Sequence, residues 1–200
     1  MPLANTSCRP SVGCSQYINP VANRKTPHQS RVEEMMQKIR LLGGLSPTPS
    51  LPCIPLDTMI LAQAKLILEE FLELMEACGL EVVTDLPRHG LDTGAQMVEV
   101  YALPRGTLRL QPIPGYSINL PEVAKEAADL SVVTTGLFSE FGIADAPILE
   151  EVDSVNLTKF APGGYLDTNR KWRKPPNFKE ADLRPILIAQ GWTDDTTTTS

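Results

Sequence analysis

Residues 57–78 read DTMILAQAKLILEEFLELMEAC, and this stretch decides the fold. Its apolar side chains recur at helical spacing over most of the circumference. Asp57 can cap the first turn, and Gly79 follows the end. We therefore expect a long helix that lies centrally among other helices.

The same helix carries four carboxylates, Glu69, Glu70, Glu73 and Glu76. At about 100° per residue, Glu69, Glu73 and Glu76 share a stripe about 60° wide, and Glu70 lies roughly 60° from Glu73 on its other side. Like charges at this spacing repel one another and weaken a helix. A helix so apolar elsewhere has little reason to collect them unless a positive ion neutralises them.

A second acidic pair, Glu126 and Asp129, lies on another apolar helix, which begins near Pro121 and ends at Gly142. Its spacing of i, i+3 points both side chains the same way. If the two helices pack antiparallel, four or five carboxylates meet in one cleft. Such an all-oxygen environment suits a hard cation such as Mg²⁺, which takes the rest of its ligands from water and substrate phosphates.

The remaining chain predicts a mainly α fold with a small β element inserted between the two acidic helices. Strand-like alternation at 97–101 and 107–110, around Pro104-Arg105-Gly106, favours a hairpin within residues 80–118. Further helices are expected at 30–42, from 145 or 146 to about 160, and at 181–190. We expect residues 1–24 to form a flexible extension, 25–192 the functional domain, and 193–200 a disordered tail.

The composition of the chain narrows the range of possible functions. The chain has 200 residues, of which 42% are hydrophobic, enough for one globular domain. A net charge of −6 without any Lys/Arg run argues against a nucleic acid polymer as partner. No apolar run reaches the roughly 18 residues of a membrane span, and no leader segment is recognisable. The prediction is a cytoplasmic protein with reduced thiols.

Besides a catalytic cation site, two alternative functions fit part of the pattern of acidic residues. In the first, the acidic stripe is a solvated face of a helical interaction module without catalysis. In the second, the protein is a phosphatase that releases single phosphates. The sequence lacks a Gly-rich phosphate loop and a histidine or cysteine nucleophile constellation, which disfavours the phosphatase.

Four motifs in a fixed order resemble the MazG-like all-α nucleoside triphosphate pyrophosphohydrolases, whose kin include dimeric dUTPases and phosphoribosyl-ATP pyrophosphatase. The likeness covers about residues 28–190. The motifs are Glu69-Glu70-x-x-Glu73, Glu126-x-x-Asp129, Val155-Asn156-Leu157-Thr158-Lys159, and Lys171-x-x-Lys174-Pro175-Pro176.

The resemblance implies a four-helix bundle that assembles as a homodimer or homotetramer. It also implies hydrolysis of a nucleoside triphosphate to monophosphate and pyrophosphate, with two or more Mg²⁺ or Mn²⁺ ions as cofactor. By position, the implied metal ligands are Glu70, Glu73, Glu126 and Asp129, while Glu69 binds a further ion or serves as general base. Glu69, Glu70 and Glu73 form the implied catalytic set, and the implied substrate-binding residues are Asn156, Lys159, Lys171 and Lys174.

The chain departs from the family pattern in the long gap between Glu73 and Glu126 and in Arg170, which replaces a glycine. The inserted hairpin and Pro-rich start resemble phage relatives called MazZ, which act on deoxyguanosine triphosphate. This resemblance implies dGTP as substrate and, for a phage protein, the host cytoplasm as location. Contacts to the nucleobase are expected near His28, Gln29 and Arg31, or from the connector at 47–55.

Overall fold

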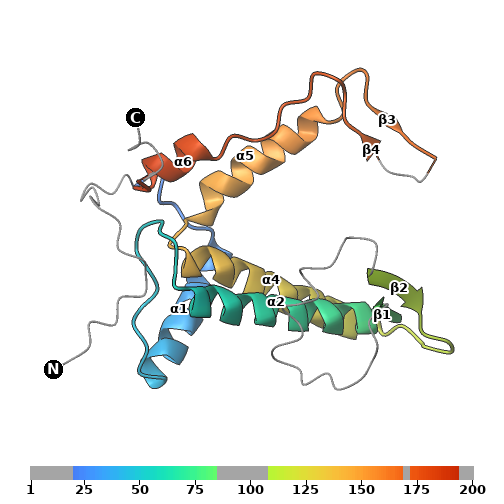
Figure 1. Ribbon diagram of the computed structural model, residues 1–200, viewed down its shortest axis with the longest axis horizontal. Helices are drawn as coiled ribbons and strands as arrows, with labels where there is room; N and C mark the ends of the chain where they lie inside the picture. Colours follow the sequence, from blue (N-terminus) through green and yellow to red (C-terminus); the bar gives the residue numbers. More distant parts are fainter. Residues whose placement is uncertain (1–19, 85–107, 169–171, 194–200) are drawn as a thin grey trace. The chain divides into compact units, whose positions relative to one another are not determined.

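The computed structural model describes residues 20–84, 108–168 and 172–193, and the chain is mainly helical (Figure 1). The predicted mainly α fold is confirmed. The elements are α1 (Pro27–Leu42), α2 (Asp57–Ala77), β1 (Leu80–Thr84), β2 (Leu108–Pro112), α4 (Leu120–Glu140), α5 (Asp145–Thr158), β3 (Tyr165–Leu166), β4 (Trp172–Arg173) and α6 (Arg184–Ala189).

The chain divides into two compact units. One unit comprises Met1–Leu56 and Thr135–Ser200, and the other is the continuous stretch Asp57–Thr134. Helix α4 contributes to both units, because the boundary at Thr134 falls within it. Both acidic motifs of the sequence belong to the unit Asp57–Thr134.

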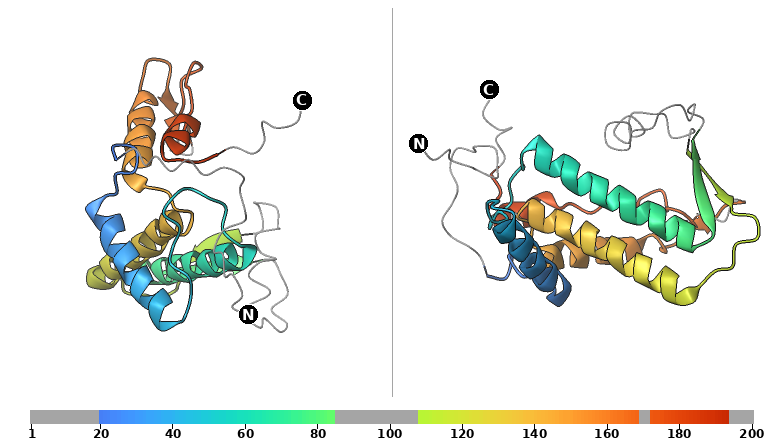
Figure 2. Two further views of the ribbon diagram at one scale, coloured as in Figure 1. Left: turned by 90° about the vertical axis from the view of Figure 1, so that its left-hand side faces the viewer. Right: turned by 90° about the horizontal axis from the view of Figure 1, so that it is seen from below.

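In the unit Asp57–Thr134, α2 and α4 lie side by side and run antiparallel (Figures 1 and 2). Near one end of the pair, the Gln63 side chain donates a hydrogen bond from Nε2 to the carbonyl oxygen of Val133, at 2.7 Å. Gln63 is buried, so this bond both satisfies its amide and fixes the register of the two helices.

A β-hairpin connects these helices, as the sequence predicted. Its second strand matches the expected strand at 107–110, but its first strand differs from the expected one. Strand β1 pairs antiparallel with β2, from Leu80 opposite Pro112 to Thr84 opposite Leu108. The expected strand at 97–101 lies outside the described residues. Leu80–Thr84 was not predicted to be a strand, because its apolar and polar residues do not alternate clearly.

Helix α2 is less buried than its composition predicted. Gln63 and Ala77 are its buried residues, whereas Leu61 and Leu66 are 40% and 44% exposed. The prediction of a central helix is therefore wrong for the single chain. A helix that is apolar all round needs neighbours on several sides.

In the other unit, two buried glutamines hold the start of α5. Gln29 accepts a hydrogen bond from the backbone amide of Asp145 at 2.9 Å and donates one to the carbonyl oxygen of Ile143 at 2.7 Å. Gln190 exchanges two bonds of 2.9 Å with the backbone of Ala144. Both side chains are fully buried, so the turn between α4 and α5 is tied to α1 and α6.

No single helix among the described residues has the length and apolar character of a membrane span. Helices α4 and α5 reach that length and apolar character only together, and the two are bent by 115° relative to each other.

The described cysteines differ in their oxidation state. Cys78 is free, whereas Cys53 is disulfide-bonded. The prediction of reduced thiols is wrong for Cys53.

Helix α4 ends in a Schellman motif at Gly142. The backbone amide of Gly142 donates to the carbonyl oxygen of Ser139, and that of Ile143 donates to Phe138. Gly142 has φ of +68°, and an added Cβ would lie 2.1 Å from the carbonyl oxygen of Leu51. The position therefore requires glycine for its backbone conformation and for the close approach of another chain segment.

We expect Gly142→Ala to lower the free energy of unfolding by about 3 kcal/mol, because left-handed strain and a backbone clash act together. Gly44→Ala is the matched control. Gly44 also ends a helix with φ of +65°, but nothing lies within 4 Å of its added Cβ. Its expected loss is about 1 kcal/mol. Urea denaturation of both variants measures the difference, and equal losses would show that the contact with Leu51 is unimportant.

Candidate functional site

The antiparallel packing of α2 on α4 brings carboxylates of the two acidic motifs together. Glu70, Glu126 and Asp129 each offer one oxygen, and these three oxygens lie within 4.8 Å of one another. Glu126 is only 5% exposed, and the other two are partly buried. Carboxylate oxygens at this separation match the ligands of a hard divalent cation.

One lysine partly compensates this charge. Lys125 Nζ lies 2.8 Å from Glu126 Oε1 and 3.1 Å from Asp129 Oδ2. Hydrogen bonds to these two carboxylates hold the pKa of Lys125 above its usual range. The other oxygen of Glu126, Oε2, is buried and has no hydrogen-bond partner among the described residues. An orphaned buried carboxylate oxygen beside two further carboxylates is a position that a cation fits.

Glu70 carries the clearest electrostatic penalty. Burial raises its pKa above 4.5, and the negative charges of Glu73, Asp129, Glu126 and Glu69 raise it further. Each cause disfavours the ionised form of Glu70 in the folded protein. The cluster therefore lowers the stability of the folded protein, as expected of a binding site rather than of a structural ion pair.

We expect Glu70→Gln to raise the melting temperature by about 1–3 °C at neutral pH without divalent ions, because it removes this repulsion. In the wild type, the raised pKa means that the folded state holds the Glu70 proton more tightly than the unfolded state. The free energy of unfolding should therefore fall as pH rises from 4.5 through the raised pKa.

Glu34→Gln is the control for this variant. A hydrogen bond from Lys38, and its charge, lower the pKa of Glu34. Removing the Glu34 charge should slightly destabilise the protein at neutral pH, the opposite sign to Glu70→Gln. Thermal melts between pH 4 and 8 test both; a destabilised Glu70→Gln variant would mean that Glu70 makes a favourable structural contact.

The two other members of the expected catalytic set, Glu69 and Glu73, lie outside the three-oxygen cluster. Glu69 is exposed. Glu73 is also exposed, and it lines a cavity of about 370 Å³. The cavity's lining residues among those that the structure describes all belong to the unit Asp57–Thr134, and they are Glu73, Glu76, Ala77, Tyr116, Glu122 and Glu126. It adjoins the cluster, because Glu126 belongs to both.

The sequence had not pointed to Tyr116 as a site residue. It belongs to none of the four motifs, and the signal available was the Pro114-Gly115 turn that precedes it. The sequence placed Glu76 on the acidic stripe without a role for it, and it gave no role to Glu122, which lies in the first turn of α4. Their lining of one cavity depends on the register of α2 against α4.

The expected phosphate-binding residues belong to the other unit, where three of the four lie together. Lys159 Nζ lies 5.8 Å and Lys174 Nζ 4.6 Å from the ring centroid of Phe178. Lys159 also donates a hydrogen bond to Asn156 Oδ1. Phe178 was not identified from the sequence, and Lys171 lies outside the described residues. Both ammonium groups therefore lie against the ring of Phe178, and that of Lys174 also forms an ion pair with Glu180.

Gln29 cannot read a nucleobase as the sequence had suggested. Its exposure is 0%, and both ends of its amide are bonded to the backbone of Ile143 and Asp145. That part of the prediction is wrong. A glutamine at a helix start looks the same in sequence whether its amide faces solvent or a buried backbone.

An antiparallel helix pair with facing carboxylates fits the MazG-like class of all-α pyrophosphohydrolases, and the hairpin is an insertion between the two helices. A family model described as phosphoribosyl-ATP pyrophosphohydrolase matches residues 32–156, which include both acidic motifs. The chain belongs to this family and is an enzyme that acts on phosphoric anhydrides in nucleotides. No curated protein matches the sequence significantly.

Proposed function

We propose that the chain hydrolyses a nucleoside triphosphate to a monophosphate and pyrophosphate at the cluster of Glu70, Glu126 and Asp129. The observation that carries this proposal is the approach of their three oxygens within 4.8 Å. Mg²⁺ or Mn²⁺, in two or more ions, are the proposed cofactors. An all-oxygen donor set with one buried orphan oxygen suits either cation.

When bound, divalent ions supply positive charge that neutralises the phosphates and the developing charge at phosphorus. The side chains then have separate tasks. Glu70, Glu126 and Asp129 hold the cations, and Glu73 extends this ligand set toward the cavity. Glu69, exposed on α2, accepts the proton of the attacking water at a carboxylate oxygen. The water oxygen bonds to the α-phosphorus, and the bond to the bridging oxygen breaks with its electron pair leaving on pyrophosphate.

We assign the sugar and phosphate contacts to Asn156, Lys159, Lys171 and Lys174. The grouping of Lys159 and Lys174 on Phe178 supports this assignment for two of them. The Phe178 ring attracts both ammonium groups, and the Lys174 group also contacts Glu180, so the two lysines form a cationic pair around this ring. Such a pair matches the multiple charges of a pyrophosphate group.

We further propose a homodimer or homotetramer as the active form. Several large apolar side chains are strongly exposed in the single chain, including Leu41 at 80% and Leu42 at 88% on α1 and Leu120 at 76% on α4. Exposed apolar surface of this kind is typical of subunit interfaces. Analytical ultracentrifugation measures the assembly directly.

The proposed substrate is a purine deoxynucleotide, with dGTP first. The charge of −6 and the absence of a basic run favour free nucleotides over a polymer. The inserted hairpin between the acidic helices supports the likeness to phage enzymes that act on dGTP.

A screen of the ribo- and deoxynucleoside triphosphates with Mg²⁺ or Mn²⁺ tests this function. We expect one monophosphate and one pyrophosphate for each triphosphate consumed, with the highest kcat/KM for dGTP. Ion-exchange chromatography separates these products from diphosphate and orthophosphate. Orthophosphate as the product would refute cleavage at the α-phosphorus, and a pyrimidine preference would refute the choice of dGTP.

Variants of the proposed cation ligands should lose activity without unfolding. We expect Glu73→Ala and Asp129→Asn each to lower kcat/KM at least a hundredfold, because each removes an oxygen ligand of the cations. Asp153→Asn, an exposed carboxylate on α5, is the matched control and should retain activity. Circular dichroism melts accompany the assays. Mg²⁺ should raise the melting temperature of the wild type and of the control more than that of Asp129→Asn; no shift in any protein would favour a non-catalytic helical module.

A further inference from the structure

The cavity of about 370 Å³ continues the groove between α2 and α4 beyond the carboxylate cluster. Glu73 and Glu126 line its side nearest the cluster, and Glu76 follows one turn further along α2. Glu76 lies six residues after Glu70, about 9 Å of helix rise. If phosphates bind at the cluster, the part of the nucleotide that can reach Glu76 is the nucleobase.

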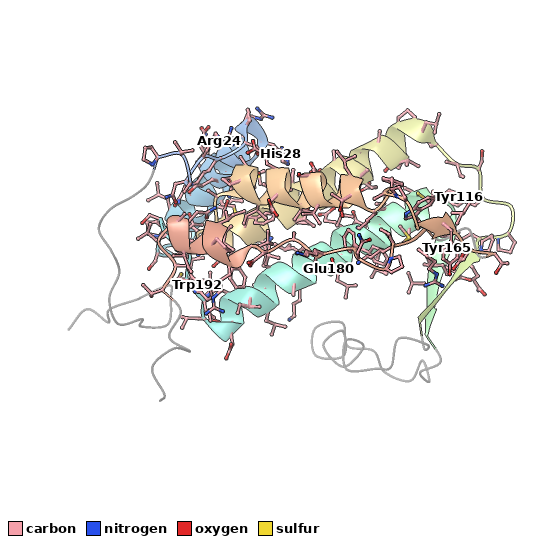
Figure 3. The ribbon with its side chains drawn as sticks, turned by 90° about the horizontal axis from the view of Figure 1, so that it is seen from above. Arg24, His28, Tyr116, Tyr165, Glu180 and Trp192 are labelled. Atoms are coloured by element: carbon pink, nitrogen blue, oxygen red, sulfur yellow. The ribbon has the colours of Figure 1, made fainter. Side chains whose placement is uncertain are left out.

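Tyr116 forms an aromatic wall of this cavity. Its backbone amide donates to the carbonyl oxygen of Ile113 at 3.2 Å across a turn in which Gly115 has φ of +76°. Its ring packs against Gly79, where an added Cβ would lie 2.9 Å from Cδ1 of Tyr116. Figure 3 shows Tyr116 beside the end of α2. The ring is thus held in place by a turn and by a residue without a side chain.

The polar groups that face Tyr116 are acceptors. Glu76 and Glu122 both line the cavity, and neither carboxylate forms an ion pair or hydrogen bond within the part of the chain that the structure describes. Glu122 lies in the first turn of α4, where the helix dipole favours a negative charge. Glu76 lies near the C-terminal end of α2, where the dipole disfavours it. The helix dipole therefore explains a negative charge at Glu122 but not at Glu76.

A carboxylate that accepts two parallel hydrogen bonds selects among the nucleobases. Guanine presents two adjacent donors, N1–H and the 2-amino group, on its Watson–Crick edge. Adenine and cytosine place an acceptor next to their amino group, and uracil and thymine flank their single donor with two carbonyls, so a carboxylate is repelled by each of these edges. An aromatic ring beside one carboxylate is therefore suited to guanine.

We propose that Tyr116 and Glu76 form the nucleobase end of the substrate site. Tyr116 stacks on the base, and Glu76 accepts hydrogen bonds from N1–H and the 2-amino group of guanine. This inference rests on the proposed function, because it places the triphosphate at Glu70, Glu126 and Asp129. It assigns a residue-level cause to the proposed preference for dGTP.

The kinetic test compares dGTP with dITP, which differs only in lacking the 2-amino group. We expect the wild type to favour dGTP by about tenfold or more in kcat/KM, as for a hydrogen bond to a charged group. Glu76→Gln should remove most of this preference, because the amide replaces one acceptor by a donor. Glu122→Gln changes the charge of the same cavity by the same amount and should keep the preference.

Tyr116 is tested with Leu and Phe. Tyr116→Leu should raise KM for dGTP about tenfold with a smaller change in kcat, since stacking contributes to binding. Tyr116→Phe keeps the ring and should resemble the wild type. An unchanged KM in Tyr116→Leu, or a dGTP preference lost in Glu122→Gln and retained in Glu76→Gln, overturns the assignment.

Calorimetric titration with dGMP and dIMP supplies a readout that does not need turnover. We expect dGMP to bind the wild type at least several-fold more tightly than dIMP, and Glu76→Gln to bind both alike. If no triphosphate releases pyrophosphate but the wild type prefers dGMP to dIMP and Glu76→Gln does not, the proposed reaction is refuted and the base site is supported. If pyrophosphate is released and neither Glu76→Gln nor Tyr116→Leu alters selectivity or binding, the base site fails alone. If neither occurs, both are refuted.

Discussion

The repulsion among Glu70, Glu126 and Asp129 is the constraint on which the structure of the site depends. Three carboxylate oxygens within 4.8 Å, with Lys125 as their counter-charge, oppose the packing of α2 on α4. The hairpin that joins the two helices and the Gln63 hydrogen bond hold the pair together against this repulsion. Because the carboxylates repel one another, binding of a cation between them would stabilise the folded protein.

Helix α4 links the site to the rest of its own chain. Its first part carries Glu126 and Asp129, and its last turn ends at Gly142 against the backbone of Leu51. The following turn is held through its backbone by Gln29. Buried side-chain amides bonded to backbone groups fix a turn more rigidly than apolar packing does, because each bond has a preferred direction.

The groove between α2 and α4 combines two uses of the same chemical group. At the cluster, carboxylates close to one another suit a divalent cation. Nearly two turns after Glu70 on α2, Glu76 is separate enough to accept hydrogen bonds from a neutral donor edge beside the ring of Tyr116. Spacing along one helix can in this way separate phosphate chemistry from base selection, since each turn advances about 5.4 Å.

Local sequence signals determined the helices and the acidic motifs, whereas α1 begins at Pro27 and α6 at Arg184, each three residues from the expected start. Periodicity predicted α2 and α4, and the spacing of Glu126 and Asp129 placed both on one face. Tertiary structure alone decided that Glu70 joins that pair while Glu69 does not, that Leu80–Thr84 pairs with Leu108–Pro112, and that the amide of Gln29 is buried. The physical reason is range: helical spacing is set by neighbours within a few residues, whereas contacts between elements depend on how distant segments pack.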